Sequence, residues 1–424
     1  MSVPPPHPRD PVIVHALLAA AFAALCAVRL TIPSAPNFDE VHYLPAVREL
    51  LALGTATNLE HPPFAKQVLA LGVLVFGDNP LGWRIMPLLF GALALYAAMR
   101  GVWQATRSRF ASVVAGLLLA TGFPLLVLSR IAMLDIFMIA FVMVALWLCA
   151  RAVRAPELAR SKLALAGVAL GLAMASKWNA VPLAMLPGLA FLVLRLREAR
   201  GGFLTARRGA PIPGMTLLEA GLWLGLVPLA TYALTYWPFL LYENVPGDPE
   251  GIVALHRQML ELQMQVKAAH PYQSGWWQWV PNSRAIWFLY EPIDGAQRGV
   301  VLLGHPLTSL LALGALVWAA RAFWLRHEIA AGAVVVLYAV SLASWIVAPK
   351  PVQFYYHYAL AHCFALVALA LLLDRLWQRG ERALVIAILA ATIGLFAWFY
   401  PILTAAPLDS ETAFLAWAWL EGWR

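Results

Sequence analysis

Residues 12–43, VIVHALLAAAFAALCAVRLTIPSAPNFDEVHY, decide the fold, because an apolar run long enough to cross a lipid bilayer passes directly into a pair of carboxylates. A helix crosses the roughly 30 Å hydrocarbon layer with about 20 apolar residues. The carboxylates that follow, Asp39 and Glu40, lie beside the membrane, where charged side chains are unfavourable and usually functional. The stretch therefore predicts a membrane helix followed by a functional loop.

The whole chain has the composition of a polytopic membrane protein. Of its 424 residues, 62% are hydrophobic and 12% are charged, and the mean hydropathy is +0.73. These values exclude a water-soluble globular enzyme. Because lipid offers no partners to backbone polar groups, we expect an all-α fold. The apolar runs predict about eleven transmembrane helices, near residues 12–30, 80–99, 110–128, 132–150, 163–176, 179–194, 216–237, 299–320, 329–347, 354–373 and 383–402.

The placement of charge predicts the topology. Most of the 30 Lys and Arg residues fall in loops on one side of the predicted spans, and most of the 22 Asp and Glu residues do not. Since basic residues gather in short cytoplasmic loops, the N-terminus is predicted on the inside of the membrane and the C-terminus on the outside. Asp39 and Glu40 then face outward. These loops also account for the net charge of +8, so no basic face remains for nucleic acid.

Outside the spans, the chain is predicted to form no soluble domain. We expect one integral membrane domain, 1–424, with a first outer loop at 31–79 and a second at 238–298. Apolar residues at helical spacing predict a helix lying along the interface at 39–53, and the run 67–76 predicts a re-entrant or interfacial helix. The second loop contains His270, Tyr272 and Trp276 within HPYQSGWWQW, which fits either a membrane-interface aromatic belt or a path for a lipid-borne sugar or an acceptor chain.

Ionisable residues recur at the outer ends of separate predicted spans: Arg84, Arg130, Asp135, Lys177, Lys350 and His357. Long basic side chains that reach from a helix end to water are the simple explanation for any one of them. Several cations on the same side as two carboxylates instead indicate an anionic group held at the membrane surface beside a base. Transfer of a sugar from a lipid phosphate fits, because Arg and Lys stabilise the phosphate as it leaves and a carboxylate takes the proton of an acceptor hydroxyl.

At these residues the chain resembles the protein O-mannosyltransferase family, including its bacterial relatives that use a phospholipid carrier. The resemblance covers most of the chain. Matching blocks occur in the family's order at Phe38–His42, Glu60–Lys66, Ser129–Asp135, Ser176–Trp178, His270–Trp279, Gly304–Pro306 and Phe354–Tyr358.

The resemblance implies a GT-C glycosyltransferase fold and inverting transfer of mannose from polyprenyl-phosphate mannose to Ser or Thr hydroxyls. It implies Asp39 as the catalytic base and Glu40 beside it in positioning the base or the acceptor. Together with their placement, it indicates that the donor phosphate is bound by Arg130, Lys177, Lys350, His357 and Arg84. The remaining site candidates are Glu60, His61, Lys66, Asp135, His270, Tyr272 and Trp276.

The expected partners are the lipid bilayer, the polyprenyl-phosphate sugar donor and a protein or glycan acceptor. No cofactor is expected. Asp39, Glu40 and Glu60 are a conceivable set of ligands for a divalent ion, although the resemblance implies no requirement for a metal. The three cysteines, Cys26, Cys149 and Cys363, lack the spacing of a metal site and are expected to be packing residues.

Two features of the chain depart from the family. The second outer loop is too short for the β-trefoil domain of the larger members, and Gln353 and Glu60 replace residues usual at their positions. The acceptor therefore stays open between a protein, a glycan and a lipid. The alternatives are a transferase of the same fold that moves another sugar, such as aminoarabinose, to a lipid or polysaccharide, and, more remotely, a transporter of lipid-linked sugars, which would place charges at mid-span.

Overall fold

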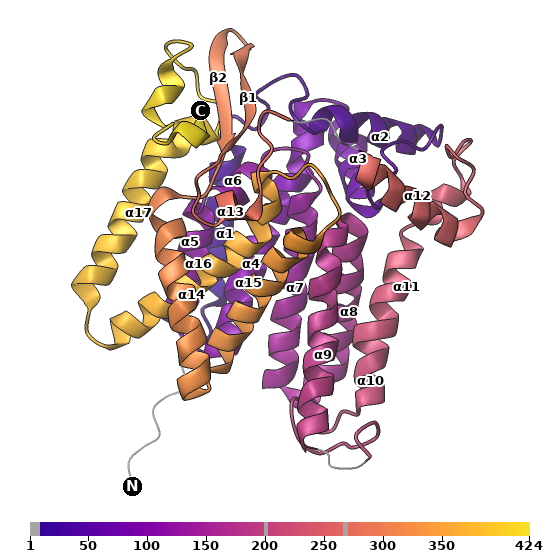
Figure 1. Ribbon diagram of the computed structural model, residues 1–424, viewed down its shortest axis with the longest axis vertical. Coiled ribbons are helices and arrows are strands. Elements are labelled where there is room, and N and C mark those ends of the chain that lie inside the picture. Colours follow the sequence, from indigo (N-terminus) through magenta and orange to yellow (C-terminus); the bar gives the residue numbers. More distant parts are fainter. Residues whose placement is uncertain (1–8, 199–201, 266–269) are drawn as a thin grey trace.

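The computed structural model describes residues 9–198, 202–265 and 270–424. Long helices run side by side in one bundle, and shorter elements cover one end of it (Figure 1). We call this end, which carries helices α2 (Glu40–Ala52), α3 (Phe64–Phe76) and α12 (Gly251–Gln265), the capped end. The C-terminus also lies there (Figure 1).

Nine helices within the described residues are long and apolar enough to cross a membrane, so the chain is an integral membrane protein. As elements, they are α4 (Pro80–Thr106), α7 (Asp135–Arg154), α8 (Ala159–Ser176), α9 (Val181–Glu198), α10 with α11 (Leu217–Gly221 and Val227–Leu234), α14 (Pro306–Arg326), α15 (Ile329–Val347), α16 (Ala359–Gln378) and α17 (Arg382–Leu403). The mostly helical membrane fold predicted from the sequence is confirmed.

The predicted number of spans is not confirmed. Helices α1 (Val12–Ala27) and α5 (Arg109–Thr121) have only 16 and 13 residues, where single spans were predicted at 12–30 and 110–128. The second of these is interrupted because Phe123 adopts a left-handed backbone with φ 77°, after which the short helix α6 (Pro124–Leu128) begins. The span predicted at 299–320 begins only at Pro306.

The interior of the bundle is built around α16 and close contacts between neighbouring helices. In the most apolar part of α16, 72% of the residues are buried, the highest share among the nine helices within the described residues. On α8, Gly167 and Gly171 face the α10–α11 segment, and a Cβ on Gly167 would come within 2.0 Å of the Trp223 carbonyl oxygen. Small residues four apart thus allow these two helices to approach closely.

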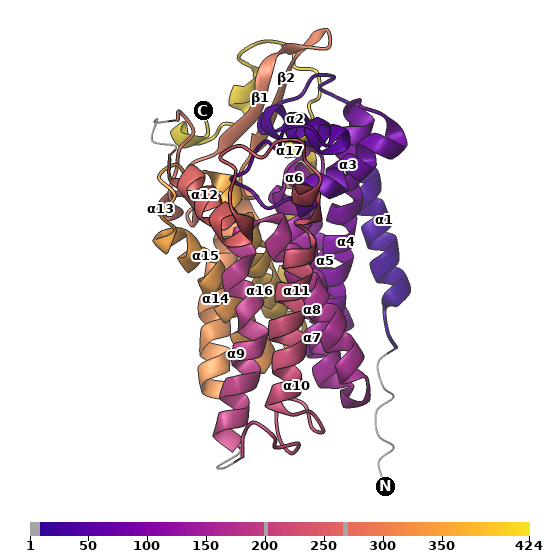
Figure 2. The same ribbon diagram turned by 90° about the vertical axis from the view of Figure 1, so that its right-hand side faces the viewer.

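The capped end holds the elements that the sequence places in the first outer loop. The helix predicted at 39–53 is present as α2, and the run predicted at 67–76 forms the end of α3. Figures 1 and 2 show α2 lying across the bundle rather than along it. It ends at Leu53, whose left-handed backbone (φ 54°) lets its N–H bond the Leu50 carbonyl.

A two-stranded antiparallel hairpin rises from the capped end, and it departs from the predicted all-α fold. Strand β1 (Ile286–Ile293) pairs with β2 (Ala296–Leu302), joined by Asp294 and Gly295 in left-handed conformations that suit a two-residue turn. The beginning of the span predicted at 299–320 therefore belongs to β2. Short apolar runs such as 300–303 fit a strand or a helix equally well by pattern.

The chain after α17 packs against this hairpin. The Leu408 N–H donates to the Gln297 carbonyl at 2.8 Å, and the Trp287 indole donates to the Trp423 carbonyl at 2.9 Å. Trp423 is 4% exposed. The last residues of the chain are thus part of the folded core of the capped end.

Candidate active site

Asp39 stands at the start of α2, and its side chain is half-buried at the capped end. Its Oδ2 accepts a hydrogen bond from the Tyr43 hydroxyl at 3.4 Å. Within the described residues, no Lys, Arg or His forms an ion pair with it. Burial raises the pKa of the Asp39 carboxyl above its usual value, and the nearby Lys177 ammonium opposes this rise. A carboxylate in such a setting is suited to accept a proton.

Glu40, the next residue, has a different environment. Its carboxylate is completely buried and accepts hydrogen bonds from Arg84 and from the backbone N–H groups of Asn37 and Ala132, the last at 2.9 Å. These contacts use both oxygens. The structure therefore assigns Glu40 to holding the segment that carries Asp39, and it has no free oxygen lone pair directed at a substrate.

Arg84 was predicted to bind phosphate, and its contacts correct that prediction. Besides Glu40, its guanidinium donates to the carbonyls of Leu30, Pro33 and Ala35, at 3.1, 2.7 and 3.3 Å. An arginine has five N–H bonds, and all five have protein acceptors here. The side chain is 1% exposed. Arg84 thus fixes the chain between α1 and α2.

Arg130 also holds backbone. Its guanidinium donates to the carbonyls of Cys26, Val28 and Arg29 where α1 ends, and reaches the Thr404 carbonyl at 3.5 Å. The last carbonyls of a helix have no partner within the helix, and a cation commonly supplies one. These contacts involve both Nη groups of Arg130, and binding of the donor phosphate by this residue stays a prediction.

Lys177 and Asp135 form a buried ion pair near Asp39. The Lys177 ammonium lies 2.8 and 2.7 Å from the two Asp135 oxygens and 5.0 Å from the centre of the Tyr356 ring. Asp135 is the first residue of α7, where the helix dipole favours a negative charge. Lys177 remains a positive group at the site, but Asp135 already balances its charge.

Lys350 follows α15 and has no ion-pair partner within the described residues. Burial lowers the pKa of its ammonium to about 8, and the neighbouring Lys177 charge adds to this effect. Gln353 fixes the loop by donating to the carbonyls of Trp345 and Lys350, at 3.0 and 3.3 Å. A lysine of this kind favours an anion brought beside it.

His357 supplies a hydrogen-bond donor that has no partner among the described residues. Its Nδ1 accepts from the Phe354 N–H at 3.0 Å, so in the neutral ring Nε2 carries the proton. The ring stacks on Trp345 with centroids 3.9 Å apart and is only 2% exposed. Within the described part of the chain, Nε2 has no partner, which is unusual for a buried polar atom. A ligand oxygen is the natural acceptor.

Glu60 and His61 lie in the turn before α3, and Lys66 lies in the first turn of α3. Lys66 donates to the carbonyls of Asn58 and His61, at 2.7 and 3.1 Å, so it stabilises the turn itself. The His61 ring lies edge-on to Tyr43 with centroids 5.8 Å apart, and burial lowers its pKa well below the usual value. From α12, Gln263 donates to the Glu60 carbonyl at 2.7 Å. His61 thus joins the site, whereas Lys66 supports it.

The predicted residues of the second outer loop lie at the rim. His270 is exposed and meets the edge of Phe354 at 5.0 Å between ring centroids, and its Nδ1 accepts from the Tyr272 N–H. Trp276 begins the short helix α13 (Trp276–Trp279) and is 37% exposed. Within the described residues, His270, Tyr272 and Trp276 make no hydrogen bond to Asp39.

Some residues of the site were not predicted. Tyr43 bonds Asp39, and the Tyr356 ring lies near Lys177. Tyr43 directly follows the block Phe38–His42 and Tyr356 lies within the block Phe354–Tyr358, so their positions in the sequence could have indicated them. Phe38 and Phe288 pack beside Asp39 with ring centroids 4.2 Å apart. Phe288 belongs to the unpredicted hairpin, and no local pattern marks it.

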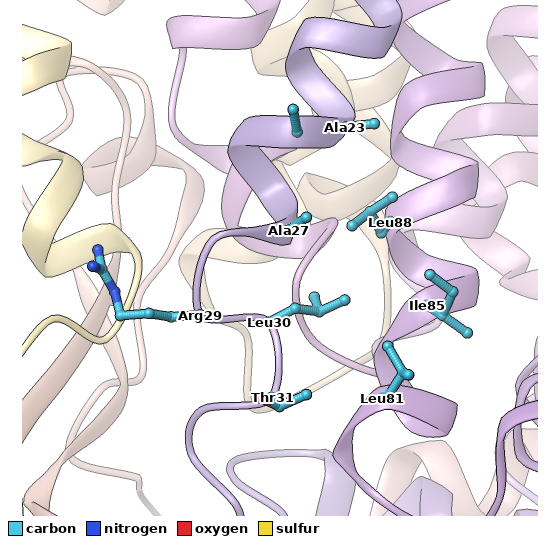
Figure 3. A pocket seen from close by; sticks show the side chains of 9 residues that line it. Ala23, Ala27, Arg29, Leu30, Thr31, Leu81, Ile85 and Leu88 are labelled. Carbon is cyan, nitrogen blue, oxygen red and sulfur yellow. The ribbon is translucent and has the colours of Figure 1, made fainter.

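A hollow of about 450 Å³ lies apart from these residues, between α1 and α4. Its walls are mainly apolar, including Ala27, Leu30, Ile85 and Leu88. Figure 3 shows the Arg29 side chain turned away from these residues, and it donates to the Thr404 carbonyl at 2.9 Å. The hollow contributes no ionisable group to the site.

The described residues contain no group of three or more His, Cys, Asp or Glu side chains placed to hold a metal ion. Asp39, Glu40 and Glu60, the set considered from the sequence, are not brought together as ligands, because Glu40 is committed to Arg84.

Comparison with known proteins identifies relatives over nearly the whole chain. Two family models match: "Dolichyl-phosphate-mannose-protein mannosyltransferase" over residues 60–205 and "C-terminal four TMM region of protein-O-mannosyltransferase" over residues 250–423. A polyprenol-phosphate-mannose–protein mannosyltransferase of Mycolicibacterium smegmatis is 29% identical, covering 92% of this chain and 88% of its own length.

Solved structures share the fold. The Saccharomyces cerevisiae protein O-mannosyltransferase Pmt1-Pmt2 complex bound to the sugar donor matches 97% of this chain and 93% of that chain, with a TM-score of 0.78 and 14% identity. ArnT from Cupriavidus metallidurans bound to undecaprenyl phosphate matches 90% of this chain and 64% of that chain, with a TM-score of 0.57 and 16% identity.

The membrane bundle and these structural matches define the fold of the protein, the GT-C fold of membrane glycosyltransferases. The two family models follow one another along the greater part of the sequence. The chain belongs to the protein O-mannosyltransferase family. The family predicted from the sequence is thereby confirmed, and with it the kind of enzyme, a mannosyltransferase.

Proposed function

We propose that this protein transfers mannose from a polyprenyl-phosphate carrier to the hydroxyl of a protein Ser or Thr, with inversion at the sugar. The observation that carries the proposal is the half-buried Asp39 carboxylate near the Lys350 ammonium. The His357 ring lies near the same lysine, and its Nε2 has no partner within the described residues. The Mycolicibacterium smegmatis relative, a polyprenol-phosphate-mannose–protein mannosyltransferase, supports this choice of donor and acceptor.

Asp39 acts as the general base. Its carboxylate takes the proton of the acceptor hydroxyl while that oxygen attacks the anomeric carbon of mannose, and the bond from that carbon to the phosphate oxygen breaks. General-base assistance of this kind contributes about 10²- to 10⁴-fold to the rate. The raised pKa of Asp39 strengthens it as a base compared with an exposed aspartate.

The departing phosphate is stabilised by Lys350, by the His357 Nε2–H and, more weakly, by Lys177. Hydrogen bonds from charged or preorganised donors are most valuable where negative charge grows during the reaction. Lys177 is the weaker contributor because Asp135 already balances its charge. The leaving phosphate is ionised, so the reaction requires no separate acid.

We place the reaction at the non-cytoplasmic face of a bacterial plasma membrane. Support comes from the basic residues that end several spans on the side opposite the capped end, among them Arg154, Arg197 and Arg326. Basic helix ends mark the cytoplasmic side. The N-terminus is then cytoplasmic and the C-terminus lies on the side of the site.

The proposal is tested with purified protein in liposomes, supplied with mannose-labelled polyprenyl phosphate and a peptide that contains Ser and Thr. We expect label on the peptide, in an anomeric configuration opposite to that of the donor, as determined by NMR. The Asp39→Asn variant, which keeps the size of the side chain, is the control for a base-dependent reaction.

The outcomes separate the candidate functions. Label that never leaves its carrier in the presence of peptides, membrane lipids and polysaccharide would overturn the transferase proposal. Label that enters a lipid or polysaccharide and never a peptide would show that the acceptor is a lipid or polysaccharide and not a protein. In sealed vesicles whose outer surface is the non-cytoplasmic face, transfer to a peptide supplied outside supports the proposed face. Transfer only to a peptide on the cytoplasmic side would refute it.

A further inference from the structure

The residue before the proposed base has an unusual backbone. Phe38 adopts φ 51°, in the left-handed region that bulky side chains rarely occupy. Such a conformation persists only where the surrounding structure fixes it. The direction in which the chain enters α2, and with it the position of the Asp39 carboxylate, depends on Phe38 staying in this conformation.

Phe288 supplies the contact that holds Phe38. Their rings stack with centroids 4.2 Å apart and planes 18° from parallel, and Phe288 is only 4% exposed. Tyr356 meets the edge of Phe38 at 5.9 Å, and its ring also lies 5.0 Å from the Lys177 ammonium. Offset-stacked and edge-to-face pairs are favourable aromatic arrangements. Three rings thus connect the base to a cation of the site.

The hairpin is shaped to present Phe288. Trp287 pairs with Val301 and Leu289 pairs with Val300, so Phe288 is the extra residue of a β-bulge. A bulge bends its strand and redirects a side chain, often next to an active site. The extra residue in this strand is the one that reaches Phe38.

The hairpin is also tied to the segment that it supports. Asp294 in its turn accepts hydrogen bonds from the backbone N–H and the hydroxyl of Ser34, which lies four residues before Phe38. Trp423 fastens the other end of β1 through the Trp287 indole. These contacts fix the hairpin at both ends of β1, the strand that carries Phe288.

We propose that Phe288 is a positioning residue for the glycosyl transfer, acting through Phe38 to hold the Asp39 carboxylate in its working orientation. The inference rests on the proposed function of Asp39. The Phe288 side chain has no charged or hydrogen-bonding group to offer the donor phosphate, so we expect its removal to lower turnover and leave donor binding intact. A residue that only packs would change stability alone.

The test compares Phe288→Leu with a matched control, Phe414→Leu, in the full-length protein in liposomes. Phe414 packs on the same hairpin against Trp287 and Tyr290, at 5.7 and 5.0 Å between ring centroids, away from Phe38. We expect at least a tenfold fall in kcat for Phe288→Leu with the Kd for polyprenyl phosphate within twofold of wild type. Phe414→Leu should keep kcat within threefold, and Phe288→Tyr, which retains the stack, should restore most of the activity.

A double-mutant cycle then asks whether Phe288 acts through Phe38. Phe38→Leu and Phe288→Leu should each lower kcat, and the double variant should be no slower than the slower single one, because both remove the same stack. If the two losses in kcat multiply in the double variant, Phe38 and Phe288 act independently, and the proposed mechanism is overturned. A Phe288→Leu protein with kcat within twofold of wild type, or with donor binding reduced in proportion to kcat, would overturn the positioning role.

Two controls keep the result interpretable. If Phe288→Leu fails to fold, Phe38→Gly leaves the hairpin intact and accepts the left-handed backbone without strain; an unchanged kcat in that variant would refute the need for the stack. Wild-type protein without any mannosyl transfer would contradict the proposed function. Active wild type with an equally active Phe288→Leu variant would contradict only the role of Phe288.

Discussion

The Arg84 guanidinium holds the Glu40 carboxylate with two hydrogen bonds, from Nε at 2.8 Å and from Nη2 at 2.7 Å, in an environment closed to solvent. One residue earlier, the Asp39 carboxylate has no cationic partner within the described residues. Two adjacent acidic side chains thus have separate tasks, one in maintaining the site and one in its chemistry. The difference lies in which way each points from the first turn of α2.

Replacing Glu40 with Gln should therefore lower stability more than a surface change would. Loss of one partner in a buried ion pair costs about 3–5 kcal/mol, since the remaining charge is left without compensation. We expect a clear drop in the melting temperature of the detergent-solubilised protein, accompanied by partial loss of activity. Glu49→Gln, on a half-exposed side chain of the same helix, is the comparison. Equal melting temperatures for Glu40→Gln and wild type would contradict the supporting role.

Asp39→Asn should give the reverse pattern. The change removes the base without removing a phosphate contact, so kcat should fall about 10²- to 10⁴-fold. Donor affinity should stay within twofold, and the melting temperature should remain close to that of wild type. Donor binding can be measured by titration with polyprenyl phosphate. Normal turnover in this variant would rule out Asp39 as the base.

Part of the candidate site could be proposed from the sequence, because its ionisable residues are concentrated in short blocks. Asp39, Lys177 and His357 lie in such blocks, and Asp39 and His357 both lie near the Lys177 ammonium. The roles of Arg84 and Arg130 were not accessible in this way. Their backbone acceptors are carbonyls 49 to 274 residues away in the chain, and no sequence pattern identifies which carbonyls accept.

The fold was predictable to the same extent. Long apolar runs specify membrane helices because the bilayer sets their length. The hairpin was missed since the apolar end of β2 runs on toward α14, and four apolar residues at 300–303 fit either structure. Phe288 was consequently missed as well, because its position in the bulge depends on pairing with β2.

Arg130→Ala separates the two roles considered for this residue. If Arg130 holds the end of α1, its loss leaves several buried carbonyls without donors, at about 1–3 kcal/mol for each buried group left unpaired. We expect a lower melting temperature with the Kd for polyprenyl phosphate unchanged. Lys350→Met should show the opposite, weaker donor binding with little change in melting. A loss of donor affinity in Arg130→Ala at unchanged stability would support its predicted role as a phosphate ligand.

Removal of divalent ions should leave the reaction unaffected. In the proposed mechanism, the positive charge that faces the leaving phosphate comes from Lys350 and Lys177, and the donor hydrogen from His357. We expect the same initial rate of mannosyl transfer in excess EDTA as in buffer with Mg²⁺. A rate that falls with EDTA and recovers on addition of one particular cation would show that a metal takes part.

The pH dependence of kcat/KM for the donor should reflect the ionisation of Lys350. Its pKa, lowered to about 8, means that the ammonium is charged below this pH and loses its charge as the pH rises through it. The attraction for the phosphate, and hence kcat/KM, should then fall above about pH 8, while the acid side of the profile reflects ionisation of Asp39 at a pH above its ordinary pKa.

Lys350→Arg tests this assignment, because a guanidinium stays charged throughout the accessible range. The alkaline fall should move upward or disappear in this variant. Lys66 has a pKa also lowered to about 8 and bonds only backbone carbonyls of its turn, so Lys66→Arg is the matched control and should retain the alkaline fall. An alkaline fall that stays in place in Lys350→Arg and moves in Lys66→Arg would show that the charge facing the phosphate is Lys66, in the first turn of α3, and not Lys350.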